Sequence, residues 1–311
     1  MDLELAIRCA GLSGLTYTSI EGDPASREQV LRASLASQGL HLVAQLFDQP
    51  SETYAFVARN ATSAFVVFRG SCTVKNVMVD CDFRNDAAVS SAFSTAANAP
   101  QMRLHRGFAR AYLSLRSQLR AALSTLPAEM DLTLSGHSMG GALAMLAALD
   151  LAQRDVPAVR ALRTYTFAAP RVGDAAFATA FRKAFPMPAE YWALQAASDA
   201  VPHLPFAAWG FLHPEGVVTL GDEMRAPSDV RMSCGEDGVC APRANLARSS
   251  DLGDSAVQMR PKEGQMQHWA TCHDLAEYLK HLHAMAPKAW AQAQAQEQQA
   301  QQAAAAAAAA A

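Results

Sequence analysis

Residues 131–144 read Asp-Leu-Thr-Leu-Ser-Gly-His-Ser-Met-Gly-Gly-Ala-Leu-Ala. The Leu-Thr-Leu segment is typical of a strand, and the Ala- and Leu-rich run from Gly140 onward is typical of a helix. Between them lies the pattern Gly-x-Ser-x-Gly, which runs from Gly136 to Gly140. A strand, a tight turn and a helix in this order expose the central serine at the edge of a sheet. We therefore predict that Ser138 is a nucleophile and not an incidental member of a glycine-rich turn.

The residue types around Ser138 suit such a turn. Gly136 and Gly140 lack the Cβ atoms that would otherwise clash across it. The start of the following helix brings backbone N–H groups and a partial positive charge close to the place where an oxyanion would develop. A serine hydroxyl is a poor nucleophile unless a base takes its proton. In α/β-hydrolases the acid and the histidine follow the serine in that order along the chain.

Two aspartates are candidates for the acid. Asp199 follows the apolar run that begins Tyr191-Trp-Ala-Leu and precedes Ala-Val-Pro, so we expect it in a loop at the end of a strand. Asp174 is the alternative, but it precedes a helical stretch, where aspartate is a preferred N-cap. We predict that Asp199 is the acid and that Asp174 is a cap.

The late histidines are the candidates for the base. His273 begins the helical stretch His-Asp-Leu-Ala-Glu-Tyr-Leu, and we predict that it is the base, with His268 as the alternative. His281 and His283 lie further along the same helix and are expected on a solvated face. Their His-x-His spacing is compatible with a metal, but no cluster of further ligands accompanies it, so neither a metal nor an organic cofactor is expected.

Composition narrows the function class. The 311 residues are 50% hydrophobic and carry a formal net charge of -3, whereas nucleic-acid binders are usually basic. No apolar run approaches the roughly 18 residues that a membrane span needs. The first residues lack the basic segment and long apolar stretch of a signal peptide, which favours the cytoplasm if the chain is full length.

Strand and helix patterns alternate along most of the chain, which predicts a mostly parallel central sheet flanked by helices. Residues 1–285 show neither an internal repeat nor a long linker, so we expect one domain. Residues 286–311 consist mainly of Ala and Gln and offer almost no side chain large enough to pack. We expect them to form a solvated tail without a catalytic part.

Several short segments, in this order, resemble the class 3 lipase family, the fungal-type lipases of the α/β-hydrolase superfamily. The matching segments are Phe68-Arg-Gly-Ser71, Leu104-His-Arg-Gly-Phe108, Gly136 to Ala144, Phe167 to Gly173, Asp199-Ala-Val-Pro202, Phe211-Leu-His213 and His273 to Leu279. The resemblance implies a catalytic triad of Ser138, Asp199 and His273. It also implies that the backbone N–H groups of Ser71 and Met139 form the oxyanion hole.

The resemblance places the family's lid at residues 72–83. As a helix, this stretch carries Val74, Val77, Met78 and Cys81 on one apolar face. A lid needs such a helix, because its apolar side covers the site in water and faces lipid when open. An ordinary surface helix packed on the core is the alternative. The lid lacks the tryptophan of some family members.

The cysteines bear on the compartment. Of the six, Cys234 and Cys240 flank a turn-like stretch and could form a disulfide, as in extracellular members of the family. The Asn60-Ala-Thr62 sequon also favours a secreted protein. The compartment therefore stays open between cytoplasmic and secreted.

The reaction predicted from these features is hydrolysis of lipid acyl esters through an acyl-enzyme, most simply of tri-, di- or monoacylglycerols at a lipid–water interface. Phospholipids, galactolipids or small soluble esters are alternative substrates of the same site. An α/β-hydrolase relative that binds ligands without catalysis is an alternative of another class.

Overall fold

The computed structural model describes residues 1–18, 24–71, 89, 91–93, 102–153, 159–185, 190–196, 199–205, 207–220, 232–234, 240–242, 273–285 and 302. Its helices are α1 (Leu3–Thr18), α2 (Pro24–Ala36), α5 (Arg106–Leu123), α6 (Met139–Ala152), α7 (Ala175–Ala184) and α9 (Leu275–Met285), with short 3-10 turns η1 (Val201–His203) and η2 (Ala207–Trp209). Its strands are β1 (His41–Asp48), β2 (Thr53–Arg59), β3 (Ser63–Phe68), β4 (Met130–His137), β5 (Val159–Phe167), β6 (Tyr191–Ala196), β7 (Val217–Leu220), β8 (Met232–Cys234) and β9 (Cys240–Pro242).

Seven strands form one sheet whose spatial order follows the sequence, from β1 to β7. The first two pairings are antiparallel, and the pairings from β3 to β7 are parallel. The predicted mostly parallel sheet is confirmed. Because parallel neighbours need crossover connections, α5, α6 and α7 each join one parallel strand to the next.

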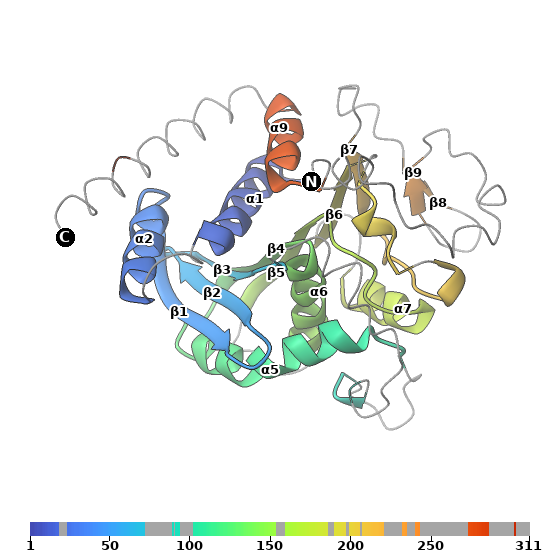
Figure 1. Cartoon of the computed structure of the whole chain (residues 1–311), viewed down its shortest axis with the longest axis horizontal. Helices are drawn as coiled ribbons and strands as arrows, with labels where there is room; N and C mark the ends of the chain where they lie inside the picture. Colours follow the sequence, from blue (N-terminus) through green and yellow to red (C-terminus); the bar gives the residue numbers. More distant parts are fainter. Residues whose placement is uncertain are drawn as a thin grey trace.

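Helices cover both faces of this sheet (Figure 1). Alternate residues of each strand point to opposite faces, so Val66 and Phe68 pack with α5, α6 and α7, whereas Phe65 and Val67 pack with α1, α2 and α9. The protein therefore has two apolar layers, one on each side of the sheet, and the predicted α/β-hydrolase architecture is confirmed.

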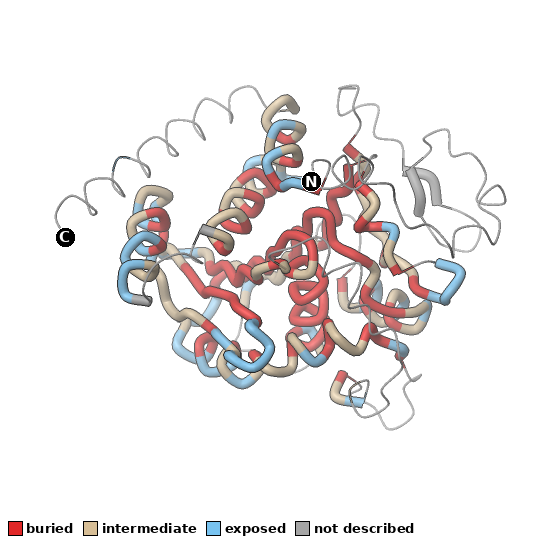
Figure 2. The backbone as a smooth tube through the Cα atoms, in the orientation of Figure 1, coloured by how far each residue is buried: buried red, intermediate tan, exposed pale blue. Residues whose placement is uncertain are grey.

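Among the described helices α6 is the most enclosed, and Figure 2 shows it in the buried interior. Every residue from Gly140 to Leu151 is buried, and all of them except Asp150 are apolar or small. Asp150 accepts hydrogen bonds from Tyr112 Oη at 2.7 Å and from Arg116 Nε at 2.9 Å, both on α5. A buried charge needs such partners, so this cluster joins α5 to α6.

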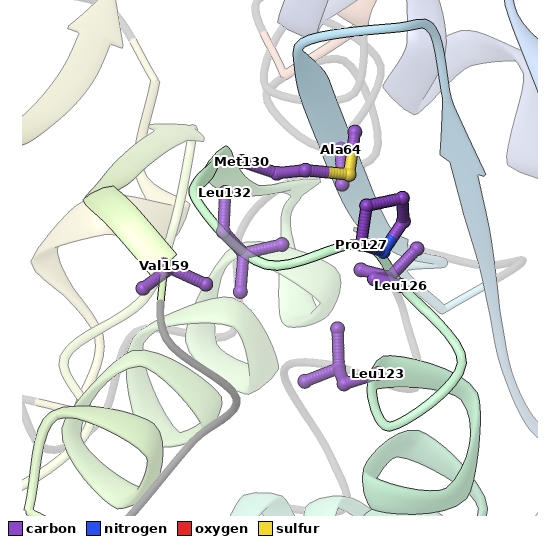
Figure 3. A pocket seen from close by; sticks show the side chains of 7 residues that line it. All are labelled: Ala64, Leu123, Leu126, Pro127, Met130, Leu132 and Val159. Atoms are coloured by element: carbon purple, nitrogen blue, oxygen red, sulfur yellow. The ribbon is translucent and has the colours of Figure 1, made fainter.

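A small apolar hollow lies at the amino ends of the parallel strands, away from Ser138 (Figure 3). Ala64, Leu123, Leu126, Pro127, Met130, Leu132 and Val159 line it. Its lining has no side chain able to act as an acid, a base or a nucleophile, so it does not compete with the opposite edge of the sheet as a catalytic site.

Some predictions fall outside the described residues. The lid residues Val74, Val77, Met78 and Cys81 lie there, as do nearly all residues of the tail at 286–311, so the lid and the domain boundary stay predictions. In β8 and β9 the backbone register sets Cys234 opposite Cys240; directly opposed residues are close enough for a disulfide, which also stays a prediction. Among the described helices, none has the length and hydropathy to span a bilayer.

Candidate active site

Ser138 lies at the sharp turn between β4 and α6. Its backbone has φ 58° and ψ −130°, a region that L-residues rarely adopt. The turn is held by a hydrogen bond from the Ser138 N–H to the Phe167 carbonyl at 2.8 Å, and by one from the Gly141 N–H to the Ser138 carbonyl at 2.9 Å. Ser138 itself is only 2% exposed. A strained backbone at a tight turn between a strand and a helix is the geometry that the Gly-x-Ser-x-Gly pattern predicts.

Two glycines make this turn possible. A Cβ on Gly136 would lie 2.3 Å from the Gly140 carbonyl group, and a Cβ on Gly140 would lie 2.2 Å from the Phe68 carbonyl oxygen. Both distances are far inside van der Waals contact with backbone atoms, which cannot rotate away. The sequence argument for glycine at these two positions therefore has a steric basis.

Ser71 and Met139, the two predicted oxyanion-hole residues, lie together. The Ser71 hydroxyl contacts the Met139 sulfur at 3.4 Å, although the two residues are 68 positions apart. Met139 is the first residue of α6, where backbone N–H groups have no partner within the helix. The donation of their N–H groups to an oxyanion stays a prediction.

Asp199 and His273 form a buried pair beyond the carboxyl ends of β6. His273 Nδ1 is 2.9 Å from Asp199 Oδ2, and both residues are at most 3% exposed. The other carboxylate oxygen of Asp199, Oδ1, accepts the Val201 N–H at 2.9 Å. Residues 74 positions apart are thus brought together as the predicted acid–base pair.

Tyr278 is a third partner of this pair. From the second turn of α9, its hydroxyl donates to Asp199 Oδ2 at 2.7 Å and accepts the Ala196 N–H at 2.9 Å. Its side chain is fully buried. The tyrosine therefore connects the end of β6 to the carboxylate and limits how the carboxylate can turn.

The second nitrogen of His273 is the one available for a proton. Nε2 is buried and has no hydrogen-bond partner among the described residues. The His137 ring lies 4.7 Å from the His273 ring, centroid to centroid, and His137 directly precedes Ser138. We predict that the Ser138 hydroxyl is the partner of this nitrogen, because Nδ1 is already occupied by Asp199.

The residues considered as alternative acid and base do not lie in this pair. Asp174 caps α7, where its carboxylate accepts the Ala176 and Phe177 N–H groups, each at 3.1 Å. His281 and His283 are half-buried on α9, beyond Leu275 and Tyr278, and His268 lies outside the described residues. Within the described part of the chain, no three His, Cys, Asp or Glu side chains gather as a metal site would require.

Sequence reasoning assigned no role to Tyr278, His137 or Tyr17. The Tyr17 hydroxyl is 2.9 Å from His137 Nδ1, and His137 Nε2 is 2.8 Å from the His273 carbonyl oxygen. Burial, with a smaller contribution from the neighbouring His273, lowers the pKa of His137 to about 3. A buried tyrosine or histidine usually needs a polar partner, but the sequence does not reveal which one.

A serine on a strand–turn–helix and an Asp–His pair beyond the same edge of a parallel sheet define the α/β-hydrolase class. Comparison with known families agrees, because residues 65–209 match the family model described as lipase (class 3). Over this segment the chain is similar to the class 3 lipases.

Several individual relatives are fungal lipases. A lipase from Rhizomucor miehei is 36% identical over 169 residues, which are 52% of this chain and 43% of that protein. A secreted mono- and diacylglycerol lipase A from Penicillium cyclopium is 28% identical over 196 residues, 60% of this chain and 59% of its own. The chain thus spans about half the length of these relatives. The solved structure of the R. miehei triacylglyceride lipase has a TM-score of 0.52 and 25% identity, over 70% of this chain and 78% of that one.

Proposed function

We propose that this chain hydrolyses the acyl esters of lipids, with Ser138 as the nucleophile, His273 as the base and Asp199 as the acid that orients it. The observation that carries the proposal is the buried Asp199–His273 pair, 2.9 Å apart, whose second imidazole nitrogen is unoccupied beside the strained turn of Ser138. A base in this state can take a proton from a serine hydroxyl.

The reaction proceeds in two halves. His273 Nε2 takes the Ser138 proton while Oγ attacks the ester carbonyl, and Asp199 stabilises the imidazolium that forms. The N–H groups of Ser71 and Met139 donate to the oxyanion. His273 then gives its proton to the leaving alcohol. In the second half, His273 activates water, which attacks the acyl-enzyme and releases the fatty acid.

Acylglycerols are the substrates that we propose first, because two of the relatives above are named for triacylglyceride and for mono- and diacylglycerol. A Cys234–Cys240 disulfide would be consistent with secretion, for which the Penicillium relative is named. Phospholipids, galactolipids and small soluble esters are the alternatives. A panel that varies the head group at constant acyl chain, and then the chain length at constant head group, distinguishes these substrates.

The test of the proposal is the Ser138→Ala variant. We expect kcat for a soluble ester and for emulsified acylglycerol to fall by about 10⁶-fold, by analogy with other triads, and labelling by a fluorophosphonate probe to disappear. Ser124→Ala is the matched control, since Ser124 is an exposed serine at the end of α5 that bonds only locally to the Ala121 carbonyl. Ester hydrolysis retained by Ser138→Ala would remove Ser138 from this role.

A folded wild-type chain that neither labels with the probe nor hydrolyses any ester of the panel would instead favour a binding protein without catalysis. The same two measurements therefore separate the enzyme from the catalytically silent relative.

A further inference from the structure

A series of hydrogen bonds links the first helix, α1, to the candidate base His273. Tyr17, on the last turn of α1, contacts His137 Nδ1 at 2.9 Å. His137, the last residue of β4, contacts the main-chain carbonyl oxygen of His273 through Nε2 at 2.8 Å. Three segments distant in sequence therefore meet directly beside Ser138. Both α1 and α9 lie outside the residues matched by the family model, 65–209.

The chemistry of the atoms fixes the direction of each hydrogen bond. A carbonyl oxygen can only accept, so His137 Nε2 must carry the hydrogen and donate it to His273. His137 is neutral, because burial lowers its pKa to about 3. A neutral imidazole has one N–H, so Nδ1 is an acceptor and the Tyr17 hydroxyl is its donor. The tyrosine thus selects the tautomer that can hold His273.

The hydrogen bond from His137 Nε2 to the His273 carbonyl oxygen fixes the backbone of the candidate base. His273 lies in a turn just before α9, outside any strand, so no sheet ladder sets its position. His137 belongs to the central strand and precedes Ser138, so its bond links the serine and the base over a short rigid path. Misplacing a catalytic group by about 1 Å can cost about 10²-fold in rate.

We propose that His137 and Tyr17 are positioning residues of the proposed hydrolase, which hold the main chain of His273 at the correct distance from Ser138. This inference rests on the proposed function. It gives α1 a part in catalysis, because Tyr17 of α1 contacts the His137 ring that holds His273. The packing of α1 agrees with this part, since a Cβ on Gly70 would lie only 2.2 Å from the Tyr17 hydroxyl, next to Ser71.

The central experiment compares two substitutions of His137 in the full chain. In His137→Gln, the side-chain amide nitrogen is the same number of bonds from the backbone as Nε2 and can still donate to the His273 carbonyl. In His137→Leu that donor is lost. We expect the Leu variant to lower kcat for a soluble short-chain ester by about 10²-fold with little change in KM. The Gln variant should stay within about 10-fold of the wild-type kcat.

The Tyr17→Phe variant tests the hydrogen bond between the Tyr17 hydroxyl and His137 Nδ1, with Tyr54→Phe as its matched control. Tyr54 also donates its hydroxyl to one side chain, Gln45, but on β1 and β2 at the far edge of the sheet. We expect Tyr17→Phe to lower kcat and the rate of fluorophosphonate labelling by about 3- to 10-fold. Tyr54→Phe should leave both within about twofold. Melting temperatures of all variants show whether each one is folded.

Several outcomes would overturn the proposal. Equal kcat in the Leu and Gln variants, or a loss expressed only in KM, would show that His137 does not act through its donor. If His137→Leu does not fold, the Tyr17→Phe variant tests the proposal. A fluorophosphonate labelling rate in Tyr17→Phe equal to that of the wild type would overturn the positioning role. Failure of the proposed function itself looks different, because then the wild-type chain neither labels nor hydrolyses an ester.

Discussion

At the scale of single residues, the Asp199 carboxylate is held by more donors than a triad requires. Oδ2 receives both His273 Nδ1 at 2.9 Å and the Tyr278 hydroxyl at 2.7 Å, while Oδ1 receives the Val201 N–H at 2.9 Å. Charge-assisted hydrogen bonds to a buried carboxylate are stronger than neutral ones. The carboxylate plane is therefore fixed before any substrate binds.

Removing the tyrosine hydroxyl should loosen this arrangement. In Tyr278→Phe, Asp199 loses one donor and the buried Ala196 N–H loses its acceptor, so we expect the free energy of unfolding to fall by about 1–3 kcal/mol. We expect kcat for a soluble ester to fall by about 10-fold, with KM nearly unchanged. Urea unfolding and steady-state kinetics measure the two effects. A wild-type kcat in a destabilised Tyr278→Phe variant would show that the tyrosine serves only the fold.

The contrast between Ser138 and Tyr278 shows what a sequence can reveal at this scale. The strained turn at Ser138 was predictable because the glycines at positions 136 and 140 meet a local steric need, which a turn of a few residues defines completely. Tyr278 lies 79 residues from Asp199, and its role depends on how α9 packs against the end of β6. The role of His137 is equally hard to predict from the sequence, since its partners come from α1 and from the turn before α9.

At the scale of elements, the predicted strands and helices that border the site are present. The expected strand after residue 130 is β4, the expected helix from Gly140 is α6, and the strand before Asp199 is β6. Hydrophobic periodicity was sufficient there, because buried parallel strands and the helices between them are continuous apolar runs. The joining of α1 to the site was not predicted, because its apolar face alone does not specify which layer it covers.

Helix α7 provides a test that separates the two candidate acids. Asp174 accepts two N–H groups of the first turn of α7, so Asp174→Ala should lower the free energy of unfolding by about 0.5–2 kcal/mol. We expect its kcat to stay within about twofold of wild type. Asp199→Asn should instead lower kcat by about 10⁴-fold, as loss of the orienting acid does in other triads. Kinetics and urea unfolding of both variants are measured side by side.

The reverse pattern, with activity lost in Asp174→Ala and kept in Asp199→Asn, would exchange the two assignments. Equal losses in both variants would remove the distinction between cap and acid on which the site assignment depends.

At the scale of the whole molecule, the two apolar layers enclose histidines that remain neutral. Burial lowers the pKa of His105 to about 4 and that of His137 to about 3. His105 caps α5, where Nδ1 accepts the Phe108 N–H at 3.3 Å and the ring stacks on Phe108 with a centroid distance of 3.8 Å. In the unfolded chain both histidines would have the ordinary pKa of about 6.5.

This difference predicts how stability depends on pH. Above about pH 6.5 these histidines are neutral in both the folded and the unfolded protein, so they do not make the free energy of unfolding depend on pH. Below it the unfolded chain binds protons that the folded protein cannot bind until about pH 4 or lower. The free energy of unfolding should therefore fall with decreasing pH by about 1.4 kcal/mol per pH unit for each such histidine. Carboxylates such as Asp131, whose pKa is lowered to about 2 by Arg160 and Arg163, contribute only below their ordinary pKa of about 4.

The His105→Asn variant isolates the contribution of one histidine to the pH dependence of the free energy of unfolding. Asparagine retains a capping side chain for α5 but does not titrate, so between pH 6 and 4.5 the stability of the variant should fall less steeply than that of the wild type. The expected difference in slope is about 1.4 kcal/mol per pH unit, measured by urea unfolding at four or more pH values. If both proteins show the same slope, His105 becomes protonated in the folded state as readily as in the unfolded chain, and the interior around α5 is more accessible to water than its packing indicates.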